Sequence, residues 1–137
     1  MPKNKSDKLW GARFERDTDG LTDQYNASIS FDIRLYREDI AGSKAHATML
    51  ARQNIITAQD RDLILNGLAE IEQEIAEGRF IFSVEREDIH LNIEAALTER
   101  IGDAGRRLHT ARSRNDQIAT DIRLFVRDAC DSAIKSL

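Results

Sequence analysis

Residues 108–117 read Leu108-His109-Thr110-Ala111-Arg112-Ser113-Arg114-Asn115-Asp116-Gln117. This stretch is rich in charged, hydroxyl and amide side chains and offers almost nothing to a hydrophobic core. Arg106 and Arg107 precede it, so a short part of an acidic chain is locally cationic. Because an apolar helical pattern begins just after it, the stretch predicts arginine donors at a helix N-terminus, an arrangement that binds carboxylates or phosphates. The alternative is a solvated loop followed by a capped helix.

The apolar pattern that follows predicts a final helix from about Gln117 to the end of the chain. Its stripe consists of Ile118, Ile122, Phe125, Val126, Ala129 and Ala133. No glycine or proline interrupts the pattern before Leu137. We therefore expect the sequence to stop inside a helix of something longer, whose apolar face needs a partner.

Two patterns in the first half of the chain predict a helical hairpin. The first begins at a cap, Ser30 or Asp32, and runs to about Asn54, with a stripe of Tyr36, Ile40, Ser43, Ala47, Leu50 and Ala51. Thr57 and Asp60 form a capping box for the second helix. The apolar stripe of this helix is Ile64, Leu68, Ile71 and Ile75, and the helix ends at Gly78. A DNA-binding helix-turn-helix would look similar, but the second helix carries acidic side chains that repel phosphates: Asp62, Glu70, Glu72, Glu74 and Glu77.

The segment between the hairpin and the cationic stretch holds one further helix. Residues 79–83 form a short apolar run that could be a strand or a buried connector. Asp88 then opens a helix with Ile89, Ile93, Ala96, Leu97 and Ile101 on one side, which Gly102 and Gly105 end. With one proline and seven glycines in 137 residues, the sequence predicts an all-α fold.

Composition narrows the class of protein. Hydrophobic residues make up 41% and charged residues 32%, as in a globular protein. A net charge of -4 argues against nucleic-acid binding. A single cysteine, Cys130, allows no internal disulfide, and no Cys/His spacing predicts a metal site. Residues 1–8 are polar, which predicts a disordered tail and no secretory signal. No apolar run is long enough to span a membrane. The expected location is therefore the cytoplasm.

Several polar residues could carry chemistry. Arg114 can bind a carboxylate through its planar fork, and Asn115 can donate an amide N–H, although Asn115 and Asp116 could equally cap the following helix. His90 could be tuned by the carboxylates of Asp88 and Glu94, whereas a lone histidine near a helix start is more often structural. His46 has no obvious partner and is expected to be solvated. His109 stands in a cationic neighbourhood that would lower its pKa, which predicts a neutral, orienting ring.

Four motifs together resemble the argininosuccinate lyase family of the fumarase/aspartase superfamily. They are Leu9-Trp10-Gly11-Ala12-Arg13-Phe14, Asn26-Ala27-Ser28-Ile29, Glu87-Asp88-Ile89-His90-Leu91-Asn92-Ile93-Glu94 and the stretch His109 to Gln117. Their order and spacing match the N-terminal portion of that enzyme, and the resemblance runs from Leu9 to the end of the chain. Ala111 departs from the family pattern, which usually has glycine there.

The resemblance implies a fold and a reaction. The family is helical and forms homotetramers around a central helical bundle. It cleaves argininosuccinate to arginine and fumarate by β-elimination in arginine biosynthesis, without metal or organic cofactor. The chain would then comprise a disordered tail (1–8), an N-terminal helical lyase domain (9–105), and the signature loop with the start of the central bundle helix (106–137).

The resemblance also assigns site residues. Ser28, Arg114 and Asn115 would bind substrate, and the residues that line or support the site would be Asp32, Asp88, His90, Thr110, Arg112 and Ser113. No catalytic residue falls within this chain, because the family's acid histidine and loop serine lie beyond residue 137. The 137 residues alone are therefore predicted to be inactive.

Two other readings stay open. A non-catalytic homologue, comparable to the lens crystallins that share this fold, would keep the packing and lose the chemistry, although such a descendant has no need to keep Arg112, Arg114 and Asn115 together. A helical interaction module would instead bind a partner through the apolar face of residues 118–133. Partner binding that is insensitive to Arg114→Ala would favour this last reading.

Overall fold

The computed structural model describes residues 20–137, and every regular element in that range is a helix. The predicted tail (1–8) and the motif at residues 9–14 lie outside the described residues. The all-α prediction is confirmed. No helix among residues 20–137 is long and apolar enough to cross a membrane.

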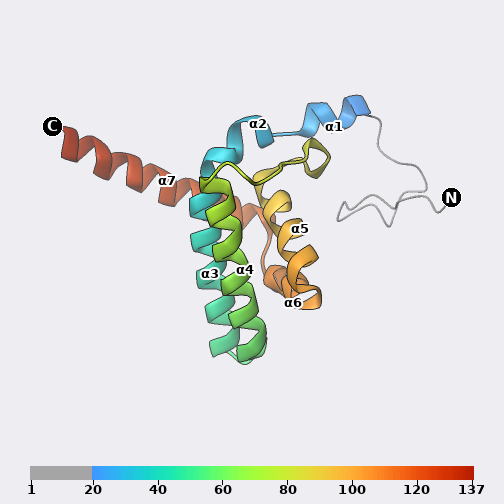
Figure 1. The fold of residues 1–137 in the computed structure, drawn as a ribbon. Helices are drawn as coiled ribbons and strands as arrows, with labels where there is room; N and C mark the ends of the chain where they lie inside the picture. Colours follow the sequence, from blue (N-terminus) through green and yellow to red (C-terminus); the bar gives the residue numbers. More distant parts are fainter. Residues whose placement is uncertain (1–19) are drawn as a thin grey trace.

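The predicted hairpin consists of α3 (Tyr36–Arg52) and α4 (Ala58–Ala76), which run side by side (Figure 1). The capping box is confirmed: the Thr57 hydroxyl accepts from the Asp60 amide at 3.0 Å. The side chains that join the two helices are fully buried and belong to the predicted stripes: Ile40, Ala47, Leu50, Ile64, Leu68 and Ile71. The chain turns beyond α4 at Gly78, whose φ of 70° is the left-handed conformation expected at a helix end.

The first predicted helix is wrong at its start. Instead of one helix from Ser30 or Asp32, the chain forms α2 (Ile29–Asp32), a 3-10 turn η2 (Ile33–Leu35) and then α3. Asp32 caps no helix because its carboxylate is used elsewhere: it accepts from the Ser28 hydroxyl at 2.6 Å and from the Ile89 amide at 3.2 Å. These bonds tie α2 to the start of α5 and bend the chain before α3.

Helix α5 (Ile89–Ile101) lies against α4, and Asp88 caps it as predicted, accepting from the Leu91 amide at 2.6 Å. Residues 79–83 form an irregular connector rather than a strand. The fully buried Asn92 side chain fixes this connector, because it accepts from the Ser83 amide at 2.8 Å and donates to the Ser83 carbonyl at 3.1 Å. A 3-10 turn, η3 (Val84–Arg86), leads to the cap.

Gly105, which was predicted to help end α5, has a different role. Gly102 ends α5 with a φ of 63°, as expected, but Gly105 lies inside the next short helix, α6 (Asp103–Arg106). A Cβ at Gly105 would stand 2.8 Å from the Cα of Thr98. Gly105 is therefore needed because two backbones meet there, and not because the chain must stop. The turn η4 (Arg107–His109) follows.

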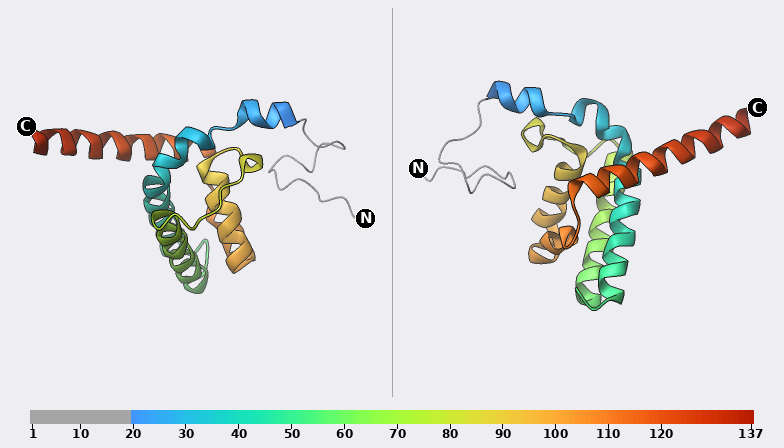
Figure 2. Two further views of the ribbon diagram at one scale, coloured as in Figure 1. Left: turned by 45° about the horizontal axis from the view of Figure 1, so that its top comes forward. Right: turned by 180° about the vertical axis from the view of Figure 1, so that it is seen from behind.

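The final helix, α7 (Arg114–Ser136), begins three residues earlier than predicted. Ser113 is its N-cap and Asp116 completes a capping box, so the cap is neither Asn115 nor Asp116 alone. The first turns of α7 pack against α3, and the rest projects from the body (Figures 1 and 2).

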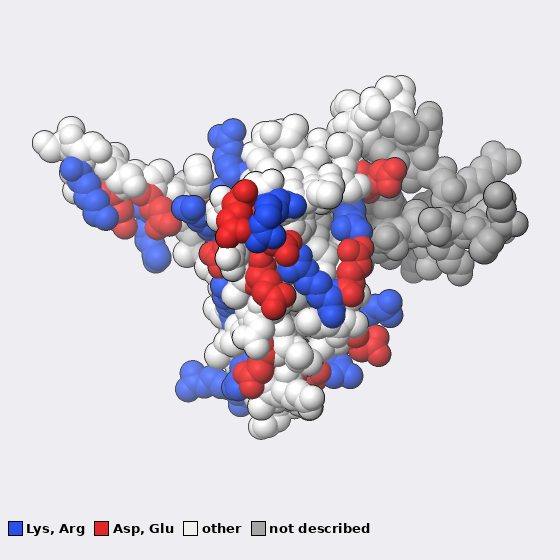
Figure 3. Space-filling view, viewed as in Figure 1, with Lys and Arg blue, Asp and Glu red and all other residues white. Residues whose placement is uncertain are grey.

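The projecting part of α7 is amphipathic. In Figure 3 its charged side chains follow one edge and uncharged atoms the other. Ile122, Val126 and Ile134 are 48%, 52% and 70% exposed. On the face of the body shown there, acidic and basic side chains are interspersed and form no basic patch (Figure 3).

Candidate active site

Four residues predicted to belong to the site line one cavity. Ser28, Asp32, Asp88 and His90 surround a space of about 490 Å³ between α2, the start of α5 and the first turns of α7. The opposite wall is apolar and comes from α7, through Ile118, Ile122 and Phe125. Residues about 60 positions apart in the sequence are thereby brought to one place.

An unusual turn makes this meeting possible. Glu87 has φ 57° and ψ −61°, and the Asp88 amide donates to the Arg86 carbonyl at 2.6 Å, which closes a strained γ-turn. The Glu87 carbonyl is thereby aimed at the start of α2, where it accepts from the Ser28 and Ile29 amides at 2.8 and 2.9 Å. Strained backbone of this kind persists only where the surrounding structure holds it in place, and it occurs most often at functional sites.

Asp32 is the buried carboxyl of the cavity. Burial raises its pKa above the ordinary value, against the opposing effect of the hydrogen bond from the Ser28 hydroxyl. Asp32 therefore binds a proton more readily than an exposed aspartate does.

Arg114 reaches the same site through Asp88. Its Nη2 donates to Glu94 at 3.0 Å, its Nη1 donates to the Gln117 Oε1 at 2.6 Å, and its Nε lies 3.8 Å from the Asp88 Oδ2. A guanidinium has five N–H groups. Two of them serve these hydrogen bonds, which leaves donors for a bound anion.

The other arginines of the cationic stretch are engaged with the protein. Arg112 turns inward, where its Nη1 donates to the Ser43 hydroxyl at 3.0 Å, and burial lowers its pKa. Arg107 bonds Asp60 at 2.6 Å. Of the cationic stretch, Arg107 and Arg114 thus have acidic partners that lie elsewhere in the chain, whereas Arg112 bonds a hydroxyl.

Besides Arg112 and Arg114, three more predicted site residues do not line the cavity. Asn115 is exposed on the first turn of α7 and does not line the cavity, and Ser113 caps α7. The Thr110 carbonyl accepts from the His46 Nε2 at 2.9 Å. The expectation of a solvated, unpartnered His46 is therefore wrong, because its partner is 64 residues away and the sequence pattern cannot show it.

His109 behaves as predicted, with a different main cause. Its pKa is lowered first by burial, and the charges of Arg114 and Arg112 add to this while Glu94 opposes it. The His109 Nδ1 lies 3.6 Å from Glu94 and makes no hydrogen bond among the described residues. A neutral ring fits this setting.

Behind the cavity lies a buried cluster that sequence reasoning missed. The His90 Nδ1 is 3.1 Å from Asp39 on α3 and 3.4 Å from Asp121 on α7, and all three side chains are 1–2% exposed. Burial lowers the pKa of His90, but the hydrogen bond and charge of Asp39, with Asp88 and Asp121, outweigh it and raise the pKa. Burial, with the charge of Asp39, raises the pKa of Asp121 to about 7.

This cluster also bears on metal binding. Asp39, His90 and Asp121 offer three ligand atoms within 4.8 Å of one another. Asp39 is already a hydrogen-bond acceptor for both His90 and Gln117. We therefore describe the three residues as a buried cluster in which His90 and Asp39 share a hydrogen bond and Asp121 stands beside them. The carboxylates that tune His90 include Asp39 and Asp121, besides the predicted Asp88.

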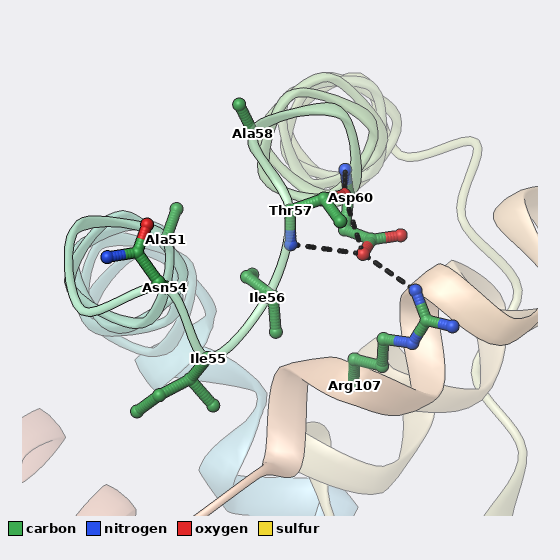
Figure 4. A pocket seen from close by; sticks show the side chains of 8 residues that line it. All are labelled: Ala51, Asn54, Ile55, Ile56, Thr57, Ala58, Asp60 and Arg107. Atoms are coloured by element: carbon green, nitrogen blue, oxygen red, sulfur yellow. Dashed lines mark hydrogen bonds and ion pairs between the residues drawn. The ribbon is translucent and has the colours of Figure 1, made fainter.

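A second pocket, of about 530 Å³, lies at the α3–α4 turn (Figure 4). Its polar side chains already bond one another: Asp60 accepts from the Thr57 amide at 3.3 Å and from Arg107. None of the predicted site residues lines it. This pocket reflects the capping of α4 and carries no predicted chemistry.

Comparison with known proteins agrees with the motifs. The family model described as Lyase matches residues 12–137. The chain belongs to this lyase family. It is 59% identical over 128 residues to the argininosuccinate lyase of Chromohalobacter salexigens, and the matched region covers 93% of this chain and 27% of that protein. It is 56% identical over 129 residues to the argininosuccinate lyase of Hahella chejuensis, covering 94% and 28%.

The argininosuccinate lyase of Geobacter sp. (strain M21) gives a similar match, 60% identical over 122 residues, covering 89% of this chain and 27% of that protein. This lyase-family chain therefore spans between a quarter and a third of the length of these curated relatives. The resemblance to argininosuccinate lyase drawn from the four motifs is confirmed.

Proposed function

We propose that this chain forms part of the substrate site of an argininosuccinate lyase, which cleaves argininosuccinate to arginine and fumarate by β-elimination in arginine biosynthesis. The observation that carries the proposal is the gathering of Ser28, Asp32, Asp88 and His90 around one cavity, with Arg114 beside Asp88. Identity of 54–60% to argininosuccinate lyases supports it.

The chemistry of the reaction explains why these residue types are useful. Removing a proton from the carbon next to a carboxylate builds up negative charge, which fixed cationic and amide donors stabilise. In this proposal the Arg114 guanidinium and the Asn115 amide bind the carboxylates of the substrate, and the Ser28 hydroxyl turns its one hydrogen from Asp32 to a substrate carboxylate on binding. Asn115 is exposed on the first turn of α7, where a ligand can reach it.

The remaining residues support the site in this proposal. Asp32 fixes the Ser28 hydroxyl, and Asp88 holds both the start of α5 and Arg114. His90 lines the cavity in front of its buried carboxylates. Thr110, Arg112 and Ser113 hold the loop, through the His46 bond, the Ser43 bond and the helix cap respectively.

Assembly and location follow the same proposal. An apolar, exposed face on α7, with Ile122, Val126 and Ile134 about half exposed or more, is suited to a helical bundle of four subunits. Residues 106–137 would be the signature loop and the start of that bundle, and residues 9–105 the N-terminal domain. The enzyme would act in the cytoplasm.

A first assay tests what the chain does alone. The purified 137 residues, mixed with argininosuccinate, should release no fumarate, because by resemblance the family's acid histidine and loop serine lie outside them. Measurable turnover by this chain would contradict that part of the proposal.

A second assay tests the site itself in a full-length lyase that carries this segment. Arg114→Ala should lower kcat/KM by roughly 100-fold or more, the usual effect of removing a donor from developing negative charge. Arg123→Ala, an exposed arginine on the same helix, is the matched control and should leave kcat/KM within about twofold of the wild-type value. Equal activity of the two variants would refute the role of Arg114.

A further inference from the structure

A line of hydrogen bonds connects the buried cluster to Arg114. The His90 Nδ1 bonds the Asp39 Oδ1 at 3.1 Å, and the same oxygen accepts a short bond from the Gln117 Nε2. The Gln117 Oε1 then accepts from the Arg114 Nη1 at 2.6 Å. Four side chains from α3, α5 and α7 are thus joined in sequence, and Gln117 is the link between the buried end and the site.

The chemistry of the two neighbours fixes the orientation of the Gln117 amide. The Asp39 Oδ1 is the acceptor in its bonds, and a guanidinium can only donate hydrogen bonds. The amide must therefore turn its NH₂ group toward Asp39 and its oxygen toward Arg114. The reversed amide would lose both bonds.

The burial of Gln117 makes this orientation rigid. Gln117 is 5% exposed, and Asp39 is 1% exposed. A buried polar side chain that lost a partner would leave an unsatisfied group, so the amide has little freedom to rotate. Arg114 by contrast stands at the site, where a long flexible side chain would otherwise sample many rotamers.

We propose that Gln117 is a positioning residue for Arg114, which transfers the fixed position of the buried Asp39 carboxylate to the guanidinium that faces the substrate. The role of Arg114 toward substrate rests on the proposed function. The positioning itself does not, because it concerns bonds within this chain. Holding Arg114 in place before substrate arrives would lower the entropy lost on binding.

The first test measures the order of Arg114 in the 137-residue chain by NMR. Hydrogen exchange of the Arg114 Nη1–H, the group that bonds Gln117, should become roughly 10-fold faster in Gln117→Met, which keeps the length of the side chain and removes both bonds. Gln73→Met is the matched control: Gln73 is an exposed glutamine whose amide bonds Glu77 at 2.8 Å, and its loss should leave Arg114 exchange unchanged.

A shorter amide covers the case in which Gln117→Met fails to fold. Gln117→Asn keeps the polar group but is one methylene too short to reach both Asp39 and Arg114, so it should also speed Arg114 exchange. Unchanged exchange in a folded Gln117 variant would overturn the proposal. Unfolding of both variants, while Gln73→Met folds, would overturn it as well, because Gln117 would then be a residue of the core and not of the site.

The second test measures kinetics in the full-length lyase. Gln117→Met should raise KM for argininosuccinate roughly 10-fold and change kcat less, because the lost bond orients a binding group. In an Arg114→Ala background it should raise KM no further, since it acts through Arg114. An equal rise in both backgrounds would refute the proposal. Absence of any turnover by the wild-type enzyme would refute the proposed function instead, and the NMR result would still decide the position of Arg114.

Discussion

The imidazole Nδ1 of His90 lies 3.4 Å from the Asp121 carboxylate, and both side chains are almost completely buried. The Asp121 oxygen at this distance, Oδ2, is close to the ring but makes no hydrogen bond among the described residues. The Asp39 Oδ1 approaches the same ring nitrogen, at 3.1 Å. Two carboxylates and one histidine therefore share a space closed to water, and their protonation must influence how firmly α7 packs against α3 and α5.

This cluster predicts that the chain becomes less stable as the pH rises from 5 to 8. The pKa of Asp121 is raised from 3.8 to about 7, so its contribution to stability is complete below about pH 4 and is lost as the pH rises through 7. His90, whose pKa is raised above 6.5, acts in the same direction above that pH. Asp116, whose pKa is lowered, loses its contribution only below about pH 4.

Urea unfolding at pH 5, 6, 7 and 8 measures the effect. The shift of Asp121 corresponds to at most about 4 kcal/mol, and the free energy of unfolding should fall by a sizeable part of that. Asp121→Asn should flatten the dependence between pH 5 and 7, because a neutral amide cannot titrate. Asp128→Asn, at an exposed position of the same helix, should preserve it. A stability that rises from pH 5 to 8 would contradict this interpretation.

Gly105 should tolerate no side chain. A Cβ there would lie 2.8 Å from the Cα and 3.0 Å from the N of Thr98, and backbone cannot move aside cheaply. Gly105→Ala should therefore lower the free energy of unfolding by about 2 kcal/mol or more. Gly42→Ala is the comparison, since its Cβ would meet only side-chain atoms at 3.6 Å or beyond. Gly42→Ala should stabilise α3 by about 0.5–1 kcal/mol. Thermal unfolding of both variants measures the two changes in stability.

Ala111 should accept glycine. Its φ of 55° lies in the left-handed region, where a Cβ costs roughly 1–2 kcal/mol and glycine loses about 0.5–1 kcal/mol more entropy on folding. Ala111→Gly is therefore expected to raise the free energy of unfolding by up to about 1 kcal/mol. Ala119→Gly, at an exposed helical position in α7, should lower it by about 1 kcal/mol. Similar losses in both variants would show that the loop does not strain Ala111.

Asn92 should be needed to hold the connector in front of the site. Its side chain bonds both the amide and the carbonyl of Ser83 and the carbonyl of Asp88, at 2.8, 3.1 and 2.8 Å. Asn92→Ala would leave these buried groups unsatisfied, and we expect a loss of about 3 kcal/mol in denaturant unfolding. The exposed Asn66→Ala on α4 should change stability by less than about 0.5 kcal/mol.

Much of the fold could be predicted because its determinants are local. The stripe of Ile64, Leu68 and Ile71 follows helical spacing, and the caps at Thr57 and Asp88 form within three residues of the groups they bond. The motif around Arg114 and Asn115 identified the family. The first helix was mistaken because Asp32, a good cap by sequence, bonds the Ile89 amide 57 residues away.

By itself, the sequence determined the four longest helices, the starts of α4 and α5, and which residues are chemically suited to hold an anion. Only the tertiary structure decided which polar groups lie next to one another. It placed Asp39 and Asp121 beside His90, Glu94 beside Arg114, and the Thr110 carbonyl beside His46. The physical reason is that helical periodicity depends on neighbours within one turn, whereas these contacts join residues 20 to 64 positions apart and depend on how whole helices pack. Within the cationic stretch, the tertiary structure turned Arg112 inward to Ser43 and held Arg114 between Glu94 and Asp88.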